Sequence, residues 1–409
     1  MRPTGFSCLI LALMLLAAGC EKKPTETIPL PPDAKKLALD NSAFAFDLYQ
    51  KLRSSEGNLF FSPYSISAAL AMTYAGARGN TEKQMAKTLR FSLDQERLHP
   101  ACAQLQAWMN QLQESGSIKL HVANSLWPQE GYKFLDEYLS LVKKHYGVSI
   151  NSVDYKSAHE TARRTINKWV QDETADRIKD LIQPGVLDPL TTLVLANAIY
   201  FKGKWANPFH PHNTSDGPFY ISATESVKIP LMALTARVRY GEMESLQVLE
   251  LPYVGNRLSM LVLLPKEIEG LGALEAILSA KNLQAWRRGL HKTKVYMIVP
   301  KFKMTCQFRL DDTLRSMGIT DSFSHLSADL SGMTGRRDLF IGAFVHKAFV
   351  EVNEEGTEAA AATGVGLPRG GAVPPVFKAD HPFLFIIQEN QTGSILFMGR
   401  VADPTKSGE

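Results

Sequence analysis

The side chains that perform most enzyme chemistry are present in this 409-residue chain, but not at the spacings that catalytic motifs require. His159 is followed by Glu, as in zinc proteases, yet Arg163 stands where that motif needs its second histidine. Gly364 and Gly366 begin a dinucleotide-like pattern in which Arg369 replaces the third glycine. There is no Gly-x-Ser-x-Gly elbow and no Cys-x-x-Cys. We therefore expect no enzyme, no metal site and no cofactor.

One long segment, residues 354–375, is chemically distinctive. Apolar, strand-like runs precede it (Leu339 to Val352) and follow it (Phe383 to Met398). A connection of about twenty residues with no element of its own is uncommon in a compact domain and is usually functional. We predict that this loop is exposed and that a protease cuts it.

The two halves of the loop differ in composition. The first half is a hinge of small residues behind an acidic entry: Glu354, Glu355, Gly356, Thr357, Glu358, Ala359, Ala360, Ala361, Ala362 and Thr363. The second half consists of Gly and Pro around Arg369. Because Arg369 is the only cation between Glu358 and Lys378, it is the residue that a trypsin-like pocket would select.

The remaining composition excludes some classes of partner. A net charge of +4 is small for this length, and no run of Lys and Arg suggests a nucleic-acid site. Cys102 and Cys306 lie in different predicted elements, so two buried thiols are expected, although the sequence leaves a disulfide open.

The N-terminal segment is predicted to be an export signal. The apolar run Leu9 to Leu16 is too short to span a bilayer. Small residues directly before Cys20 resemble a bacterial lipobox, in which Cys20 is lipidated; an ordinary signal peptide cut nearby is the alternative. We therefore predict that residues 1–20 are a signal and that residues 21–37 form a flexible tether. The lipid is expected to be the only contact of the protein with a membrane. The chain is expected to be exported and held at the cell envelope or surface, or otherwise secreted.

The order of the elements predicts the fold class. Helical patterns dominate the first half and strands the second, without steady alternation, which indicates an α+β fold with mostly antiparallel sheet. Val227–Leu231 and Val238–Met243 are predicted as separate strands, with a break at Gly241. No linker is apparent after residue 40, so we expect one domain over residues 38–404, followed by a tail over residues 405–409.

Four segments in the same order resemble those of the serpins, a family of serine protease inhibitors, across nearly all of residues 38–404. They are Asn58–Ile66, Leu195–Trp205, Val345–Ala348 with Val352–Ala361, and His381–Ile387 with Gly393–Val401. The resemblance implies three mostly antiparallel sheets, about nine helices and an exposed reactive-centre loop. Residues 174–178 depart from the family pattern, which usually has Gly or Asn followed by Lys in this turn.

The resemblance also implies a mechanism. A serine protease attacks the loop and forms an acyl-enzyme, and the cut loop inserts as a new central strand of the main sheet before the protease can deacylate. The protease supplies the Ser-His-Asp chemistry. The implied partner is a trypsin-like serine protease held in a covalent complex, with a monomeric inhibitor and no nucleic acid.

Insertion requires small side chains on one face of the hinge. Because a strand alternates its faces, Thr357, Ala359, Ala361 and Thr363 would enter the interior, where all four are small enough to pack. Glu358 would then face outward, and Gly356 would give the backbone freedom to swing.

A second set of residues matches the family's polar cluster where the sheet opens. This set contains Ser62, Ser65, Asn197 and His346, with Trp205 near the point of hinge entry. We interpret the cluster as hydrogen bonds that must be satisfied in both states of the sheet.

The cleaved bond is predicted to be Arg369–Gly370. Counting from Gly356 with the commonest loop length of the family indicates cleavage after Gly370 instead, and cleavage after Leu367 by a chymotrypsin-like enzyme is the third possibility. Two alternative functions also remain: a non-inhibitory serpin that acts as a binding module, and a cross-class inhibitor of cysteine proteases.

Overall fold

The structure is a computed structural model that describes residues 29–114, 116–357 and 373–407. The predicted lipidation site Cys20, the hinge residues Glu358–Thr363 and the predicted reactive bond Arg369–Gly370 lie outside the described residues.

Ten α-helices and two short 3-10 helices occur in this described part of the chain, close to the number expected. The α-helices are α1 Pro32–Leu52, α2 Pro63–Gly76, α3 Gly79–Thr88, α4 Gln95–Gln111, α5 Asp136–Tyr146, α6 Tyr155–Glu173, α7 Leu271–Ile277, α8 Ala280–Arg288, α9 Asp311–Met317 and α10 Ser331–Thr334.

The strands lie mainly in the second half of the chain, and the predicted α+β class is confirmed. They are β1 Leu59–Phe61, β2 Ile118–Pro128, β3 Leu193–Lys204, β4 Thr214–Tyr220, β5 Ser226–Glu242, β6 Leu246–Pro252, β7 Leu258–Pro265, β8 His291–Pro300, β9 Phe302–Arg309, β10 Ala343–Val352, β11 Gly356–Thr357, β12 Val376–Lys378, β13 Phe383–Glu389 and β14 Ile395–Val401. Antiparallel pairs predominate, and among the named strands of the described residues only β3–β10 and β8–β12 are parallel.

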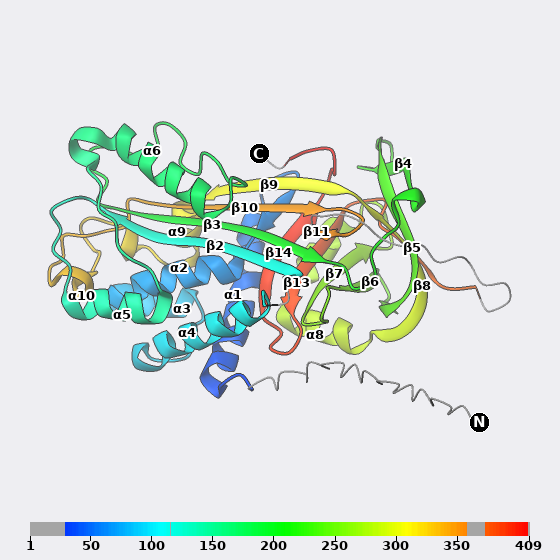
Figure 1. Ribbon diagram of the computed structural model, residues 1–409, viewed down its shortest axis with the longest axis horizontal. Helices are drawn as coiled ribbons and strands as arrows, with labels where there is room; N and C mark the ends of the chain where they lie inside the picture. The colour runs from blue at the N-terminus through cyan, green and yellow to red at the C-terminus, as the bar shows by residue number, and fades with distance from the viewer. Residues whose placement is uncertain (1–28, 115, 358–372, 408–409) are drawn as a thin grey trace, which may run out of the picture.

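The smaller sheet contains β2, β3, β10 and β9 side by side, with the two-residue β11 at one end (Figure 1). Its central strand β3 is buried on both faces. Ile199 and Phe201 pack into the main core, whereas Ala198 and Tyr200 pack into a second core under α6. This two-sided burial explains why the sequence of β3 is continuously apolar.

The larger sheet is continuous where the resemblance implied two sheets. β5 is one strand of 17 residues rather than the two separate strands predicted, and it pairs with β4, β6 and β8. Gly241 does not break it, because this residue pairs with Val248 of β6. Within the described residues the strands therefore form two hydrogen-bonded sheets, because the long β5 pairs with β4, β6 and β8 and joins them in one sheet.

The helix α2 lies beneath the smaller sheet and is buried nearly all round. Its N-terminus is capped by Ser62, whose Oγ accepts a hydrogen bond from the Ser65 backbone N–H at 3.1 Å, and Pro63 occupies the first turn. The sequence pattern predicted both features. The cap places Ser62 and Ser65 under the centre of the sheet.

Both ends of the described chain pack against the rest of the domain. α1 begins at Pro32, inside the range predicted as a tether (residues 21–37), because Ala34 and Leu37 are buried in the core. The tail predicted over residues 405–409 is docked in its described part, where Ser407 accepts a backbone hydrogen bond from Thr305 and Lys406 accepts one from the Asn58 side chain.

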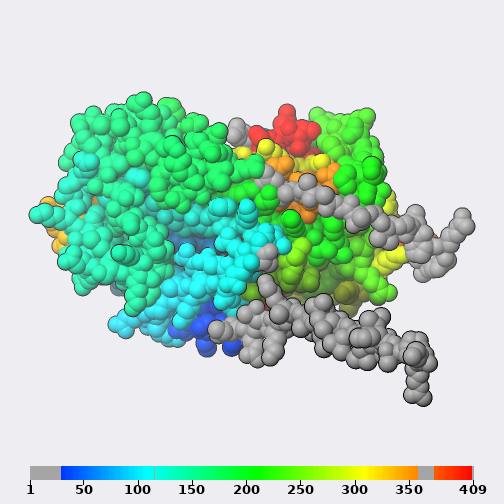
Figure 2. Space-filling view, in the orientation of Figure 1, coloured from blue at the N-terminus to red at the C-terminus, as the bar shows by residue number. Residues whose placement is uncertain are grey.

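The two ends of the molecule differ in content. Helices α5 and α6 form one end, and strands β4, β5 and β8 form the other, as the space-filling view also shows (Figure 2). β11, and with it the start of the loop, lies toward the strand-rich end (Figure 1). The sheet that would receive the loop therefore runs from the strand-rich end toward the helical end.

Candidate functional site

The hinge begins as a short strand on the edge of β3. β3 and β10 pair in parallel from Val194–Ala343 to Tyr200–Phe349, but β3 continues to Lys204 without β10 beside it. Gly356 pairs with Lys204 and Thr357 with Gly203, in antiparallel orientation. Because β2 covers the other edge of β3 over this stretch, β11 occupies the same edge as β10. The loop thus enters the sheet where β3 and β10 separate.

The backbone of Gly356 explains why glycine is needed at this position. Its φ of 154° lies in the region that L side chains rarely adopt. A Cβ atom built at this position would lie 1.9 Å from the Gly203 carbonyl oxygen. Any side chain at residue 356 would therefore push the hinge away from β3.

Thr357 is fully buried and points toward the core, as predicted for the first inward residue. Its Oγ1 lies 3.1 Å from the Tyr253 hydroxyl. The Tyr253 ring stacks on Trp205, with ring centroids 4.6 Å apart. The Trp205 indole N–H in turn donates to the Asn353 carbonyl at 3.1 Å. These contacts fix residues 353–357 at both ends, through Asn353 at one end and Thr357 at the other.

Charged and backbone groups fasten the residues just before the hinge. The Glu354 carboxylate accepts from Thr214 Oγ1 at 2.9 Å and forms an ion pair with Lys301 at 2.9 Å. The backbone N–H groups of Trp205 and Phe209 donate to the carbonyls of Glu355 and Glu354. Sequence reasoning placed Glu354 in the hinge but missed Lys301 and Thr214, because nothing local connects these residues to the loop.

The pKa of Glu354 reflects two opposing effects. Burial disfavours its charged form, but hydrogen bonds from Lys301, its own backbone and Thr214 outweigh burial and hold the pKa below the ordinary value. Glu354 is therefore ionised at neutral pH, which the ion pair requires.

A second polar cluster lies beneath the middle of β3 and β10. The Asn197 amide donates to Ser65 Oγ at 2.6 Å and to the Ser65 carbonyl at 3.1 Å. Ser62 Oγ donates to the Leu396 carbonyl at 2.7 Å, and the Ser62 backbone N–H donates to His346 Nε2 at 3.1 Å. The structure thus brings together Ser62, Ser65, Asn197 and His346 from three distant segments.

One member of this cluster was not predicted. Asn124 on β2 contributes its Oδ1, which accepts hydrogen bonds from Ser65 Oγ and from the Asn197 amide. Asn124 faces Asn197 across the β2–β3 pair. A polar residue in an otherwise alternating strand was the only local sign of its role.

The partners of His346 define its protonation state. A backbone N–H can only donate, so Nε2 accepts from Ser62, and Nδ1 must carry the proton that it donates to Asn197 Oδ1. Burial lowers the pKa of His346 to about 3. The ring is consequently neutral at physiological pH and bridges β10 to both α2 and β3.

Trp205 does not belong to this central cluster. It lies at the far end of β3, against Tyr253 and the residues before the hinge. The five residues predicted for sheet opening therefore divide between two places on β3, one under its middle and one at its C-terminal end.

The turn that departs from the family pattern adopts a conformation suited to glycine. Ala175 and Asp176 have φ angles of 50° and 61°, in the left-handed region. Gln171 Nε2 donates to Asp176 Oδ1 at 2.5 Å. This side-chain contact supports a turn that Gly or Asn would adopt with less strain.

Other sites were sought among the described residues. These residues contain no group of three or more His, Cys, Asp or Glu side chains that could hold a metal ion. No helix in the described ranges is both long and apolar enough to cross a bilayer. Cys102 and Cys306, both described, are not joined by a disulfide.

The model of the serpin family, described as serine protease inhibitors, matches residues 39–404. The chain therefore belongs to the serpin family.

Among curated proteins, it is similar to leukocyte elastase inhibitor A of Mus musculus and leukocyte elastase inhibitor of Homo sapiens. Each is 43% identical over 382 residues, which cover 90% of this chain and 100% of the relative. Serpin B3 of Homo sapiens is 42% identical over 387 residues, covering 89% of this chain and 98% of that protein.

Solved structures give the same fold. Uncleaved ovalbumin superposes with a TM-score of 0.82 at 33% identity, covering 90% of this chain and 100% of ovalbumin. Human thyroxine-binding globulin, solved in complex with thyroxine, superposes with a TM-score of 0.82 at 34% identity, covering 91% of this chain and 100% of that protein. The predicted serpin fold is confirmed.

Proposed function

We propose that this serpin is a suicide-substrate inhibitor of trypsin-like serine proteases, cleaved between Arg369 and Gly370. The observation that carries the proposal is the position of β11. Thr357 already lies buried on the edge of β3, in the orientation that an inserting strand needs.

Continuing the β11 register along β3 supports this role for the hinge. Glu358 would come opposite Lys202 and could pair with it, whereas Ala359 would come opposite Phe201 on the core side. Ala360 would come opposite Tyr200, where β10 now pairs through Phe349. Insertion beyond Ala359 thus requires β10 to leave β3, so the sheet must open.

The same register supports the choice of bond. Leu367 would come opposite Leu193, the first residue of β3. Arg369 would then lie just past the end of the new strand. An acyl-enzyme attached at Arg369 would be carried to the end of the sheet opposite the hinge, and all pairing positions along β3 would be filled.

The chemistry belongs to the protease. Its serine attacks the Arg369 carbonyl, the Gly370 amine leaves with a proton, and an ester joins Arg369 to the serine. Arg369 fits the carboxylate at the base of a trypsin-like pocket. Insertion must then be faster than hydrolysis of that ester by water.

Trypsin provides the direct test. We expect a band at the summed mass on a denaturing gel, loss of trypsin activity, and a released peptide that begins at Gly370. Arg369→Ala should abolish the band with trypsin; if the band persists, the bond assignment is wrong. A peptide that begins at Gly371 instead would identify the alternative bond. Elastase and a papain-like cysteine protease belong in the same panel, because the relatives are named for elastase and cross-class inhibition is an alternative.

A non-inhibitory binding role is the second candidate. The likeness to thyroxine-binding globulin, solved in complex with thyroxine, favours it. The run of small residues in the hinge opposes it, because such a run is needed only for insertion. Clean cleavage by trypsin, with trypsin activity fully retained, would exclude inhibition of trypsin. The same outcome with every protease of the panel would support the binding role.

The proposal also includes a lipid anchor at Cys20 on an exported, bacterial protein. Its support is the apolar run Leu9–Leu16 and the small residues before Cys20. The curated relatives named above come from mouse and human, so the bacterial assignment rests on this segment alone. Mass spectrometry of the N-terminal peptide should detect acylated Cys20, and Cys20→Ala should release the protein from the membrane fraction.

A further inference from the structure

The hydroxyl of Tyr253 contacts Thr357 of the hinge. The turn that carries Tyr253 is itself fixed by residues at and just after the end of β13. This turn (residues 253–257) joins β6 to β7. Its front side meets the end of β3, because Val254 N–H donates to the Lys204 carbonyl at 2.8 Å and Trp205 forms a β-bridge with Tyr253. The position of the turn therefore determines the position of the Tyr253 hydroxyl.

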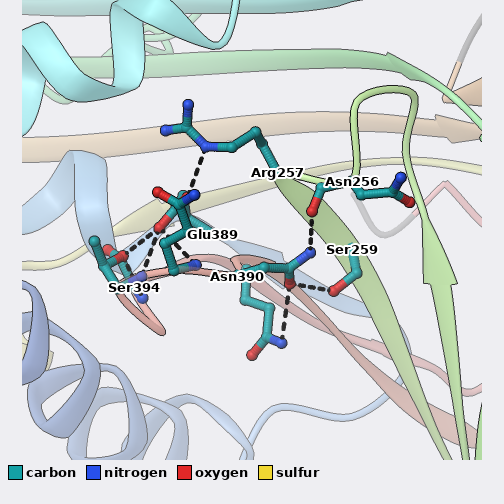
Figure 3. A network of polar contacts seen from close by, with 9 residues as sticks. Asn256, Arg257, Ser259, Glu389, Asn390 and Ser394 are labelled. Atoms are coloured by element: carbon teal, nitrogen blue, oxygen red, sulfur yellow. Dashed lines mark hydrogen bonds and ion pairs between the residues drawn. The ribbon is translucent and has the colours of Figure 1, made fainter. Parts of the chain in front are cut away.

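The turn has a shape that needs support. Gly255 and Asn256 both have positive φ angles, of 85° and 56°. Asn390 supplies the support: its Nδ2 donates to the Asn256 carbonyl at 2.9 Å, and its backbone N–H donates to the Arg257 carbonyl at 2.8 Å. Ser259 Oγ donates to Asn390 Oδ1 at 2.7 Å, so the Asn390 side chain is itself fixed (Figure 3).

A buried ion pair completes the support. The Glu389 side chain is fully buried, and its Oε1 accepts from Arg257 Nε at 3.2 Å (Figure 3). Its Oε2 accepts from the backbone N–H groups of Gln391 and Thr392 and from the Thr392 hydroxyl. The Arg257 guanidinium also lies over the Trp108 ring of α4, 4.4 Å from its centroid. A buried carboxylate without an ionic partner is strongly destabilising. Loss of Arg257 should therefore lead Glu389 and the adjacent turn to shift.

We propose that Arg257 and Glu389 are positioning residues that act through Tyr253 to hold Thr357 on β3, and so determine how far the hinge is inserted before cleavage. The inference rests on the proposed function only in identifying the hinge as a future strand. Releasing Thr357 would lengthen the free loop and should speed attack by the protease.

Backbone hydrogen exchange tests the inference without any protease. In Arg257→Met, exchange of residues 353–357 should accelerate about ten-fold, as expected for losing roughly one net buried hydrogen bond. Tyr253→Phe removes only the hydroxyl and should accelerate the same residues. Because both act through one contact, the double variant should exchange no faster than the faster single variant. If the acceleration in the double variant equals the product of the accelerations in the two single variants, the proposal is overturned.

The matched control is Arg239→Met. Arg239 pairs with the nearly buried carboxylate of Glu250 at 2.9 Å across strands β5 and β6, and its Nη2 donates to the Arg287 carbonyl at 2.8 Å. This variant should leave exchange at residues 353–357 unchanged. If it accelerates them as much as Arg257→Met, or if Arg257→Met accelerates β13 and β14 equally, the effect is general destabilisation and the proposal fails.

Glu389→Gln covers the case in which Arg257→Met does not fold. It preserves shape but removes the charge that holds Arg257, and it should accelerate residues 353–357; unchanged exchange there would overturn the proposal. The rate of covalent complex formation with trypsin should rise in every variant that accelerates exchange. If the wild-type chain forms no complex, the proposed function fails while the exchange results still decide this inference.

Discussion

His346 and Asn197 lie opposite each other on the parallel strands β10 and β3, and His346 Nδ1 is hydrogen-bonded to Asn197 Oδ1. This contact spans the edge that an inserting strand must occupy. In the continued register of β11, Thr363 would come opposite Asn197. The hydrogen bond across β3 and β10 must therefore be broken before insertion reaches Thr363.

Acidification should weaken the fold through His346. The pKa of His346 is lowered to about 3, so between that value and about 6.5 the unfolded chain binds a proton that the folded chain does not. The neutral His346 ring contributes fully to the free energy of unfolding above about pH 6.5. As pH falls below this value, the free energy of unfolding decreases by about 2–4 kcal/mol. Urea unfolding from pH 7.5 to 4.5 measures it.

His346→Gln separates this effect from that of other groups. The variant should be less stable at pH 7.5 but should lose less further stability on acidification. Burial also lowers the pKa of His99, to about 4, and His99→Gln gives the comparison for a buried histidine outside the sheet. An unchanged pH dependence in His346→Gln would show that His346 does not titrate as stated.

The ion pair at the hinge should contribute modestly and only when Glu354 is ionised. Lys301→Met should lower the unfolding free energy by about 1 kcal/mol at pH 7.5, a small value because the Lys301 side chain is partly exposed. The pKa of Glu354 is lowered in the folded state, so this contribution is present above the ordinary carboxyl pKa and is lost as pH falls through the folded value.

A surface pair serves as the control for Lys301→Met. Lys168 and Asp172 are both exposed on α6. Lys168→Met should change the free energy of unfolding by no more than about 0.5 kcal/mol, both at pH 7.5 and at a pH where Glu354 is protonated. Equal losses in the two variants would show that the hinge pair has no special role.

A charge at Thr357 should convert the inhibitor into a substrate. Thr357→Arg places a cation in a fully buried position, where an unpaired charge is strongly disfavoured. We expect trypsin to cleave this variant at Arg369 with at least about a ten-fold smaller covalent fraction. The melting temperature should rise on cleavage in the wild-type chain but not in the variant.

Glu358→Arg is the control for a new charge at the outward-facing neighbour, where solvent weakens its repulsion with Lys202 on the opposite position of β3. It should keep most of the covalent band. If the two variants behave alike, the alternation of inward and outward residues is wrong.

Relief of backbone strain should stabilise the turn after α6. Ala175 has a φ of 50°, so Ala175→Gly should raise the unfolding free energy by about 1 kcal/mol. The same substitution at Ala107, exposed within α4, should lower it by about 1 kcal/mol. Urea unfolding at neutral pH compares the two, and a loss of stability in Ala175→Gly would contradict the assignment of strain.

Local patterns predicted a large share of this structure. The cap at Ser62 and Pro63 begins α2, and the unbroken apolar run at β3 is buried on both faces. The small residues from Thr357 onward indicated a future strand. The predictions for α2 and β3 succeeded because capping and burial depend on neighbours within a few residues. The future strand stays a prediction, because residues 358–363 lie outside the described residues.

The tertiary structure decided what joins distant segments. It showed that Asn124 completes the cluster around Asn197, that Lys301 and Thr214 fasten Glu354, and that β5 runs through Gly241. It also placed the Tyr253 hydroxyl against Thr357 and paired Arg257, in the turn that carries Tyr253, with Glu389. Such contacts follow from how strands pair and helices pack across the whole chain, so no local pattern of residues specifies them.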